Sequence, residues 1–239
     1  MTDTMISNLV ANRWYPLTKK SLVRCASSTL AAKSGNRQLE IRWFFDNHSS
    51  MKLELHTERL LLTPLASNDV DVALEMFTDA EVAKYVDGVM SAEKITKEMS
   101  GWIKRGGNGC IGIWCISDRK SMEKYGSAAL LPMPVDEDDT DYNLVVPEKM
   151  PGGDVEIGYF LKRSAWGHGF ATEACKRLLQ FAFQKTSLNE VVATFDEKNI
   201  ASEHVLKKAG FIDKGTMRCY GETGPNYRIT REEWSRMRR

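Results

Sequence analysis

The stretch DVEIGYFLKRSAWGHGFATEA, residues 154–174, decides the fold because two different hydrophobic periods meet within it. Residues 154–161 alternate as a strand does, with apolar side chains on one side at Val155, Ile157 and Tyr159. Beyond Gly167 and Gly169, apolar residues recur at helical spacing. These are Ala171, Ala174, Cys175, Leu178, Leu179 and Ala182. The sequence therefore predicts a strand, a glycine-rich loop and a helix in direct succession.

A loop of this kind is suited to binding a phosphate group. Glycines let backbone N–H groups turn towards one point, and the N-terminus of the next helix adds the positive end of its dipole. The loop is a poor dinucleotide fingerprint, because Thr172 stands where the third glycine belongs and Glu190, about 20 positions on, begins the next strand. It also lacks the Gly-Lys-Ser/Thr of a P-loop. A tight turn that binds nothing is the other interpretation.

Strand and helix patterns alternate on both sides of this block. Downstream, residues 189–195 predict a strand, and a short helix runs from its cap at Asn199 to Gly210. Upstream, residues 53–65 hold a strand, and helical patterns follow Ser67 and Ser91. Two further strands are expected at 110–117 and 126–131. The loop that follows, 132–153, carries an acidic run at 136–141, which predicts either a solvated loop or a surface that attracts a cationic acceptor.

Composition excludes several classes of protein. The chain has 239 residues, of which 42% are hydrophobic, enough for the core of one large domain. Its 33 basic and 32 acidic residues nearly cancel, which argues against a nucleic-acid partner. No apolar run approaches the roughly 18 residues of a membrane helix. Five cysteines without a C-x-x-C pair and four scattered histidines predict neither a disulfide framework nor a metal site. We therefore expect a soluble, metal-free protein of the cytoplasm.

Residues 1–50 differ from the rest of the chain. They hold seven basic and three acidic residues, a net charge of +4, which leaves −3 for the remainder. They lack the apolar core of a secretory signal, although a basic, serine-rich start is also typical of a transit peptide. We expect a poorly ordered extension, or translation that begins at Met51, and a single domain over residues 52–239. Five aromatic residues leave open a docking role: Trp14, Tyr15, Trp43, Phe44 and Phe45.

Four motifs in a fixed order resemble a known family. They are EIGY (156–159), WGHGFATEA (166–174), NIAS (199–202) and LKKAGF (206–211), and TERL opens the domain at 57–60. The pattern resembles the GNAT superfamily of acyl-CoA-dependent N-acetyltransferases, and in particular the branch named for ribosomal-protein N-terminal acetyltransferases. It covers about residues 53–235 and leaves out residues 1–50. The resemblance implies an α/β fold, with a mixed, mostly antiparallel central sheet flanked by helices.

The resemblance also implies a site for acetyl-CoA, the expected co-substrate. In the family, backbone amides of the glycine-rich loop hold the CoA pyrophosphate. The matching residues are Trp166, Gly167, His168, Gly169, Phe170, Ala171 and Thr172. Trp166 replaces the usual Gln or Arg, a departure that binding through the backbone tolerates. Phe160 and Leu161 match positions whose backbone pairs with the pantetheine arm. Asn199 matches an asparagine that contacts the same arm, and it is also a plain helix cap.

Acetyl transfer to an amine needs a base. An alkylammonium with a pKa of roughly 10.4 costs roughly 4.6 kcal/mol to deprotonate at pH 7. Glu156, on the strand before the glycine-rich loop, is the candidate base, and its other interpretation is a strand glutamate paired with a basic residue. Ser202 matches a position proposed to protonate the departing thiolate, and Tyr220 is a candidate for the acceptor pocket. An α-amino group, with a pKa of roughly 7.7–8.0, needs little help from a base.

The reaction expected from the resemblance is acetyl transfer from acetyl-CoA to a primary amine, by direct attack in a ternary complex. The acceptor, a small molecule or a protein N-terminus, stays open. A CoA-binding sensor or scaffold without turnover is the alternative. We expect a monomer or a homodimer.

Overall fold

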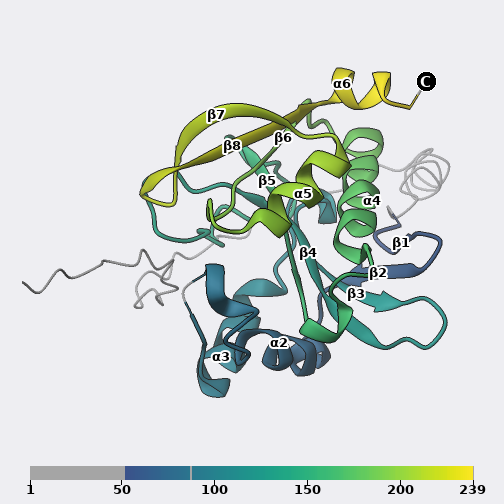
Figure 1. Ribbon diagram of the computed structural model, residues 1–239, viewed down its shortest axis with the longest axis vertical. Coiled ribbons are helices and arrows are strands. Elements are labelled where there is room, and N and C mark those ends of the chain that lie inside the picture. Colours follow the sequence, from purple (N-terminus) through teal and green to yellow (C-terminus); the bar gives the residue numbers. More distant parts are fainter. Residues whose placement is uncertain (1–51, 87, 239) are drawn as a thin grey trace, which may run out of the picture. The chain divides into compact units, whose positions relative to one another are not determined.

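The computed structural model describes residues 52–86 and 88–238, and those from Leu53 onward belong to one compact unit. Its eight strands form one sheet in the order β1-β2-β3-β4-β5-β6-β8-β7 (Figure 1). The strands are β1 (Leu55–His56), β2 (Leu60–Pro64), β3 (Gly112–Asp118), β4 (Lys124–Pro132), β5 (Val155–Leu161), β6 (Glu190–Ala193), β7 (Ile212–Cys219) and β8 (Glu222–Thr230). Every neighbouring pair is antiparallel except β5 and β6. The predicted mixed, mostly antiparallel sheet is confirmed.

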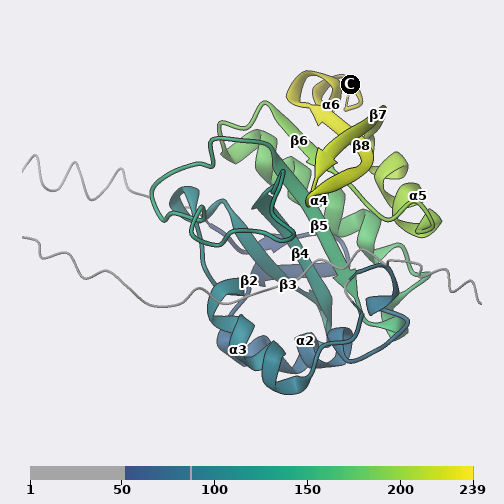
Figure 2. The same cartoon turned by 90° about the vertical axis from the view of Figure 1, so that its left-hand side faces the viewer.

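Helices cover both faces of the sheet. They are α2 (Val70–Phe77), α3 (Ala92–Trp102), α4 (Phe170–Lys185), α5 (Ile200–Ala209) and α6 (Arg231–Arg236), with 3₁₀ turns η1 (Ser67–Asp69), η2 (Ala83–Tyr85), η3 (Gly107–Gly109) and η4 (Arg163–Ala165). Along β2, Leu60 and Leu62 pack with α4 in the main core, so Leu61 between them points to the opposite face. Figures 1 and 2 show α2 and α3 on that opposite side of the sheet from α4.

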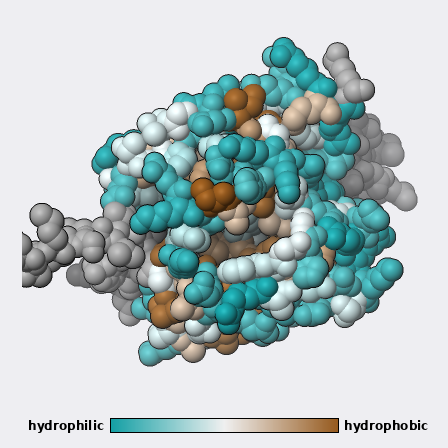
Figure 3. All heavy atoms as spheres, in the orientation of Figure 1, coloured by the Kyte–Doolittle hydropathy of each residue, from teal (hydrophilic) through white to brown (hydrophobic). Residues whose placement is uncertain are grey.

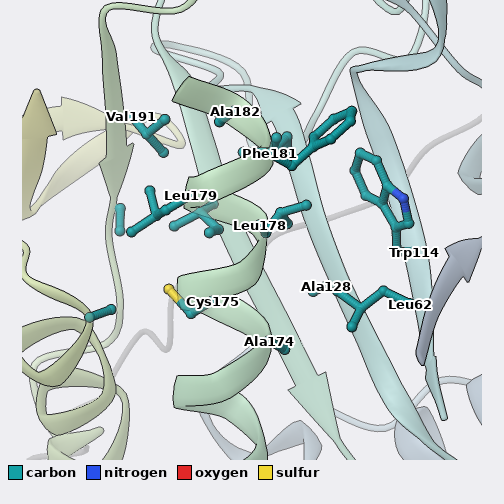
Figure 4. Packing of buried hydrophobic residues seen from close by; sticks show 14 of the residues in the cluster. Leu62, Trp114, Ala128, Ala174, Cys175, Leu178, Leu179, Phe181, Ala182 and Val191 are labelled. Atoms are coloured by element: carbon teal, nitrogen blue, oxygen red, sulfur yellow. The ribbon is translucent and has the colours of Figure 1, made fainter. Parts of the chain in front are cut away.

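The main core lies between α4 and the sheet (Figure 4). Leu178 and Phe181 point from the helix towards Leu62 and Trp114, and the rings of Phe181 and Trp114 meet edge to face with centroids 5.6 Å apart. Cys175 is fully buried in the same cluster, and burial raises the pKa of its thiol to about 12. Together with buried Cys110 and Cys115, it is a small core residue and not a nucleophile, because a buried thiol stays protonated.

The first predicted strand is two short strands joined by a turn. The Thr57 hydroxyl oxygen accepts a hydrogen bond from the N–H of Leu60 at 2.7 Å, and this local bond competes with a continuous strand. Residues 53–65 therefore fold back on themselves as β1 and β2. The turn places Arg59 at the edge of the unit, next to the start of α4.

The two parallel strands separate almost at once. Only one residue pair joins β5 to β6, Glu156 with Val192, whereas β5 pairs with β4 along the whole length of β5. Beyond that pair, β5 continues to Leu161 and the glycine-rich loop, while the chain after β6 turns into α5. The candidate site lies at the place where these two strands diverge.

Candidate active site

A cleft of about 930 Å³ opens where β5 and β6 diverge. That volume lies in the range of cavities that hold a cofactor-sized molecule, roughly 300–1,000 Å³. Its walls are β5, the glycine-rich loop, the segment after β6 with one side of α5, the β7–β8 turn and the segment around η2. Figure 3 shows a hollow near the middle of this face, with hydrophobic residues gathered inside it. An apolar cleft with a few polar groups is the usual form of a ligand site.

The glycine-rich loop forms one end of the cleft. Gly167 and Gly169 have φ values of 76° and 78°, which residues with a Cβ rarely adopt. Gly169 is the N-cap of α4 and provides no side chain, so no side chain caps the first N–H groups of this helix. These groups suit an anion, because a helix N-terminus carries free donors and a positive dipole end. Six of the seven loop residues expected to hold a cofactor line the cleft: Trp166, Gly167, Gly169, Phe170, Ala171 and Thr172.

His168 is the exception within this loop, because it is not part of the cleft wall. Its carbonyl oxygen accepts a hydrogen bond from Arg59 at 2.9 Å, and its ring stacks on Phe170 at 5.5 Å. The His168 side chain therefore does not line the cleft. The residue belongs to the outer side of the loop.

Arg59 holds this loop from outside. Its guanidinium donates to the carboxylate of Glu173, with the Nε–Oε2 distance at 2.7 Å, and lies 4.7 Å above the ring of Phe170. Glu173 also accepts bonds from the Thr57 hydroxyl and the Arg59 N–H, at 2.5 and 3.0 Å. Burial opposes ionisation of Glu173, yet these hydrogen bonds outweigh it and lower its pKa. The turn between β1 and β2 is thus fastened to the first turn of α4.

The end of β5 supplies free backbone groups, but not at both expected residues. Alternate residues of a strand direct their backbone groups to opposite neighbours. Phe160 pairs with Ser127 of β4, and its carbonyl oxygen lies only 2.0 Å from where a Cβ on Gly126 would stand. The expectation that Phe160 offers its backbone to a pantetheine arm is therefore corrected. Tyr159 and Leu161 face the β6 side instead, and the carbonyl of Leu161 already accepts from Nε1 of Trp166 at 2.8 Å.

Glu156 stands on the floor of the cleft, at the last point where β5 meets β6. Its carboxylate accepts a hydrogen bond from the hydroxyl of Tyr220. Burial raises the pKa of Glu156 to about 7, and the bond from Tyr220 opposes that rise. Among the described residues, Tyr220 is the side chain that hydrogen-bonds to it and no basic group pairs with it, so the alternative of a strand ion pair is not what the structure places here. A carboxyl group that titrates near neutral pH is suited to accept and return a proton.

Ser202 and Asn199 meet the cleft at the start of α5. The Asn199 side chain accepts a hydrogen bond from the N–H of Ser202 at 3.1 Å, so its role as a helix cap is confirmed. The Ser202 hydroxyl lies 2.9 Å from the hydroxyl of Tyr159, whose oxygen is also 3.2 Å from the Ser202 carbonyl. Burial raises the pKa of Tyr159, so the phenol stays protonated and able to donate. All three residues line the cleft.

The charges around the cleft come from different elements. Basic side chains line it from α5 and the turn before it: Lys198, His204 and Lys208. Carboxylates line it from the other walls at Glu81, Glu156 and Glu222, and beside Lys198 at Asp196 and Glu197. The basic groups can attract a phosphate-bearing ligand. Within residues 52–86 and 88–238, no three His, Cys, Asp or Glu residues are grouped as metal ligands. No helix in that part of the chain is long and apolar enough to cross a membrane.

Sequence reasoning missed two of these residues as functional groups. Tyr159 reads in the sequence as one apolar position of an alternating strand, yet its hydroxyl reaches Ser202 on α5. Arg59 reads as part of an opening motif, yet it holds the glycine-rich loop. The sequence makes Tyr220 a candidate for the acceptor pocket but contains no sign of its hydrogen bond to Glu156. The available signal was an aromatic residue directly before Gly221 in a hairpin turn, where small polar residues are the rule.

Known proteins share this sequence pattern and fold. The family described as "Acetyltransferase (GNAT) domain" matches residues 59–212. The uncharacterized N-acetyltransferase p20 of Bacillus licheniformis is 28% identical over 171 residues, which are 70% of this chain and 86% of that protein. The FsC-acetyl coenzyme A-N(2)-transacetylase of Aspergillus fumigatus is 27% identical over 194 residues, 77% of this chain and 79% of that protein. Among solved structures, RimL, a ribosomal L7/L12 alpha-N-protein acetyltransferase in complex with coenzyme A, has a TM-score of 0.55 at 19% identity, covering 73% of this chain and 95% of its own.

Proposed function

The chain belongs to the GNAT acetyltransferase family, and we propose that it transfers the acetyl group of acetyl-CoA to a primary amine by direct attack in a ternary complex. The observation that carries this proposal is the convergence of three features on one cleft. The N-terminus of α4, which no side chain caps, the part of β5 beyond its pairing with β6, and the carboxylate of Glu156 all line it. Each of the three serves one part of the reaction.

The first two features bind acetyl-CoA. The pyrophosphate lies against the N–H groups of residues 167–172, where Gly167 and Gly169 keep the backbone open and Arg59 keeps the loop in place. Lys198, before α5, and Lys208, on α5, add positive charge to the cleft wall. The pantetheine arm runs along the unpaired side of β5, at Tyr159 and Leu161, and Asn199 stands beside it. The residues present in the cleft therefore fit this co-substrate.

Glu156 removes the proton that the amine must lose. The amine nitrogen attacks the thioester carbonyl carbon, a C–N bond forms, and Glu156 accepts the proton from nitrogen. Near neutral pH a carboxyl with a pKa of about 7 is partly ionised and is a stronger base than an ordinary glutamate. An acceptor with a low pKa, such as a protein N-terminus, depends on Glu156 less than an alkylamine does.

Ser202 acts on the sulfur atom of the leaving CoA. As the C–S bond breaks, the electron pair stays on sulfur, and the Ser202 hydroxyl provides a proton to the thiolate. Tyr159 can replace that proton across the 2.9 Å between the two hydroxyl oxygens. A protonated thiol is a better leaving group than a free thiolate.

The test is acetyl transfer to a panel of amines: peptides with free N-termini, amino acids, polyamines and aminoglycosides. We expect at least one of them to become acetylated, with release of one CoA for each acetyl group transferred. In Glu156→Gln, the maximal rate falls by about 10²–10⁴-fold for an alkylamine, while acetyl-CoA affinity stays within about threefold.

Two controls accompany this test. Glu232→Gln removes an exposed carboxylate of α6 that pairs with Arg236, and it keeps the wild-type rate. Glu222→Gln tests the other carboxylate on the hairpin side of the cleft. A rate that falls in Glu222→Gln but not in Glu156→Gln moves the base to Glu222. Tight acetyl-CoA binding without transfer to any amine contradicts the proposal and favours a CoA-binding sensor.

A further inference from the structure

The turn that joins β7 to β8 carries a residue that the turn itself disfavours. Tyr220 and Gly221 are its two central residues, between the paired residues Cys219 and Glu222. Both have positive φ values, 51° and 72°. Two-residue turns with positive φ at both positions strongly prefer Asn, Asp or Gly, because a larger side chain is strained there. Backbone strain of this kind persists where another contact of the same residue compensates for it.

The compensating contact of Tyr220 is with Glu156. The two residues are 64 positions apart in the chain, and the tyrosine hydroxyl donates to Oε1 of the carboxylate. The backbone of the turn is held independently. The N–H of Tyr220 donates to the carbonyl of Pro134 at 3.2 Å, and the N–H of Gly221 donates to that of Val135 at 3.0 Å. The position of the hydroxyl is thus fixed by the hairpin and by the segment after β4, neither of which contains Glu156.

Few other groups act on this carboxylate. Cys219 of β7 and Tyr142 of the segment after β4 lie within electrostatic reach of Glu156. The negative charge of Asp139 raises the pKa of Tyr142 and of Tyr220, and Thr140 hydrogen-bonds to Tyr220. In the same way, the negative charge of Glu222 raises the pKa of Cys219, and that of Glu98 raises the pKa of Tyr142. In the described part of the chain none of these neighbours is a cation, so the Tyr220 hydroxyl is the group that offsets the burial of Glu156.

We propose that Tyr220 is a positioning residue of the acetyl-transfer reaction: its hydroxyl holds one oxygen of Glu156 and leaves the other oxygen to the amine. The inference rests on the proposed role of Glu156 as base. It assigns a function to the β7–β8 turn, which supplies the donor. A donated hydrogen bond favours the ionised form of a carboxylate. Loss of that donor therefore moves the ionisation of Glu156 to higher pH and leaves less base at neutral pH.

The direct experiment compares two Tyr→Phe changes on the same hairpin. Tyr220→Phe keeps the ring and removes the donor. Tyr227→Phe, on β8, removes a similar hydroxyl that donates to Glu203 at 2.9 Å, away from the cleft wall. The carboxyl signal of Glu156 is followed by NMR during a pH titration. We expect its titration to move up by about 0.5 pH or more in Tyr220→Phe and to stay in place in Tyr227→Phe. The acidic limb of the rate profile moves in the same direction, and acetyl-CoA affinity stays unchanged.

A second variant separates this role from a structural one. Tyr220→Asn places a residue that the turn prefers, which offsets part of the lost packing of the ring against Met133, Val192 and Cys219, and a thermal melt checks that the variant is folded. We expect the same upward direction of the Glu156 titration in this folded variant. A Glu156 titration that is unchanged in both variants overturns the inference, whatever the amine panel shows. A wild-type protein that acetylates no amine overturns the proposed function, and it does so even when the titration moves.

Discussion

The hydroxyl of Tyr159 lies 2.9 Å from the hydroxyl of Ser202, so the end of β5 and the first turn of α5 meet on one wall of the cleft. The two residues are 43 positions apart. Because the phenol is buried and stays protonated, the pair forms a short path for a proton to a group in the cleft. Each hydroxyl is a hydrogen-bond partner of the other, so we consider the two residues as one unit.

This pair predicts a non-additive effect on the rate. Ser202→Ala removes the nearer donor, so we expect kcat to fall by about tenfold or more, with acetyl-CoA affinity unchanged. Tyr159→Phe keeps the ring, and we expect a smaller loss. The double variant, measured in the same assay, should be no slower than Ser202→Ala alone, because residues that act as a unit are not additive. Ser100→Ala, on the exposed face of α3, is the matched control. Losses that multiply in the double variant would show that the two hydroxyls act separately.

The glycine-rich loop predicts a specific loss of cofactor binding. Gly169→Asp places a side chain and a negative charge at the N-terminus of α4, where we propose the pyrophosphate binds. We expect acetyl-CoA affinity, measured by calorimetry, to fall by about tenfold or more. Gly215→Asp is the control, because Gly215 has a similar φ, 86° against 78°, and open space around it, but lies in β7 outside the cleft wall. Equal affinity in the two variants, both folded, would remove the pyrophosphate from this loop.

The raised pKa of Glu156 predicts a pH dependence of stability. Its ordinary value is 4.5 and its folded value is about 7. Below pH 4.5 the group is protonated in both states, so its burial costs nothing. As the pH rises towards 7, the unfolded chain loses this proton first, and the free energy of unfolding falls. The shift corresponds to about 3 kcal/mol, and contact with solvent in the cleft reduces the effect to about 1–3 kcal/mol.

Glutamine at this position removes the titration. The wild type should therefore lose stability relative to Glu156→Gln between pH 5 and pH 8, by about 1–3 kcal/mol in denaturant unfolding. Glu232→Gln, which alters an exposed carboxylate, should follow the wild-type curve. Parallel curves for wild type and Glu156→Gln would mean that the carboxyl titrates at its ordinary pH in the folded protein.

The domain boundary predicts that residues 1–50 are dispensable for catalysis. Among the described residues, those of the cleft wall lie within 81–225, and none of the family motifs falls before Thr57. A chain that begins at Met51 should stay soluble, bind acetyl-CoA with the affinity of the full chain and keep its turnover number. Size-exclusion chromatography and the amine assay check both points. Aggregation or loss of activity would mean that the first fifty residues stabilise or complete the domain, and the boundary would be wrong.

The sequence by itself determined the strand, the glycine-rich loop and the helix of the central block, and the cap of the helix that follows. The change of hydrophobic period across 154–182, the glycines at 167 and 169 and the cap at Asn199 are local features, since each depends on residues within a few positions. The structure places β5, α4 and the Asn199 cap where these patterns predict them. Local periodicity fixes which residues of a strand or helix share a face, whatever the rest of the chain does.

Only the tertiary structure decided which side chains and backbone groups meet at the cleft. Tyr220 reaches Glu156 because β8 pairs with β6 and brings the β7–β8 turn to the start of β5, beside Pro134 and Val135. Arg59 reaches Glu173 across 114 positions because the chain folds back at Thr57. The direction that backbone groups take at Phe160 and Tyr159 follows from the register between β4 and β5. Sheet order and register are set by the packing of all strands together, so no pattern within a short stretch of sequence records them.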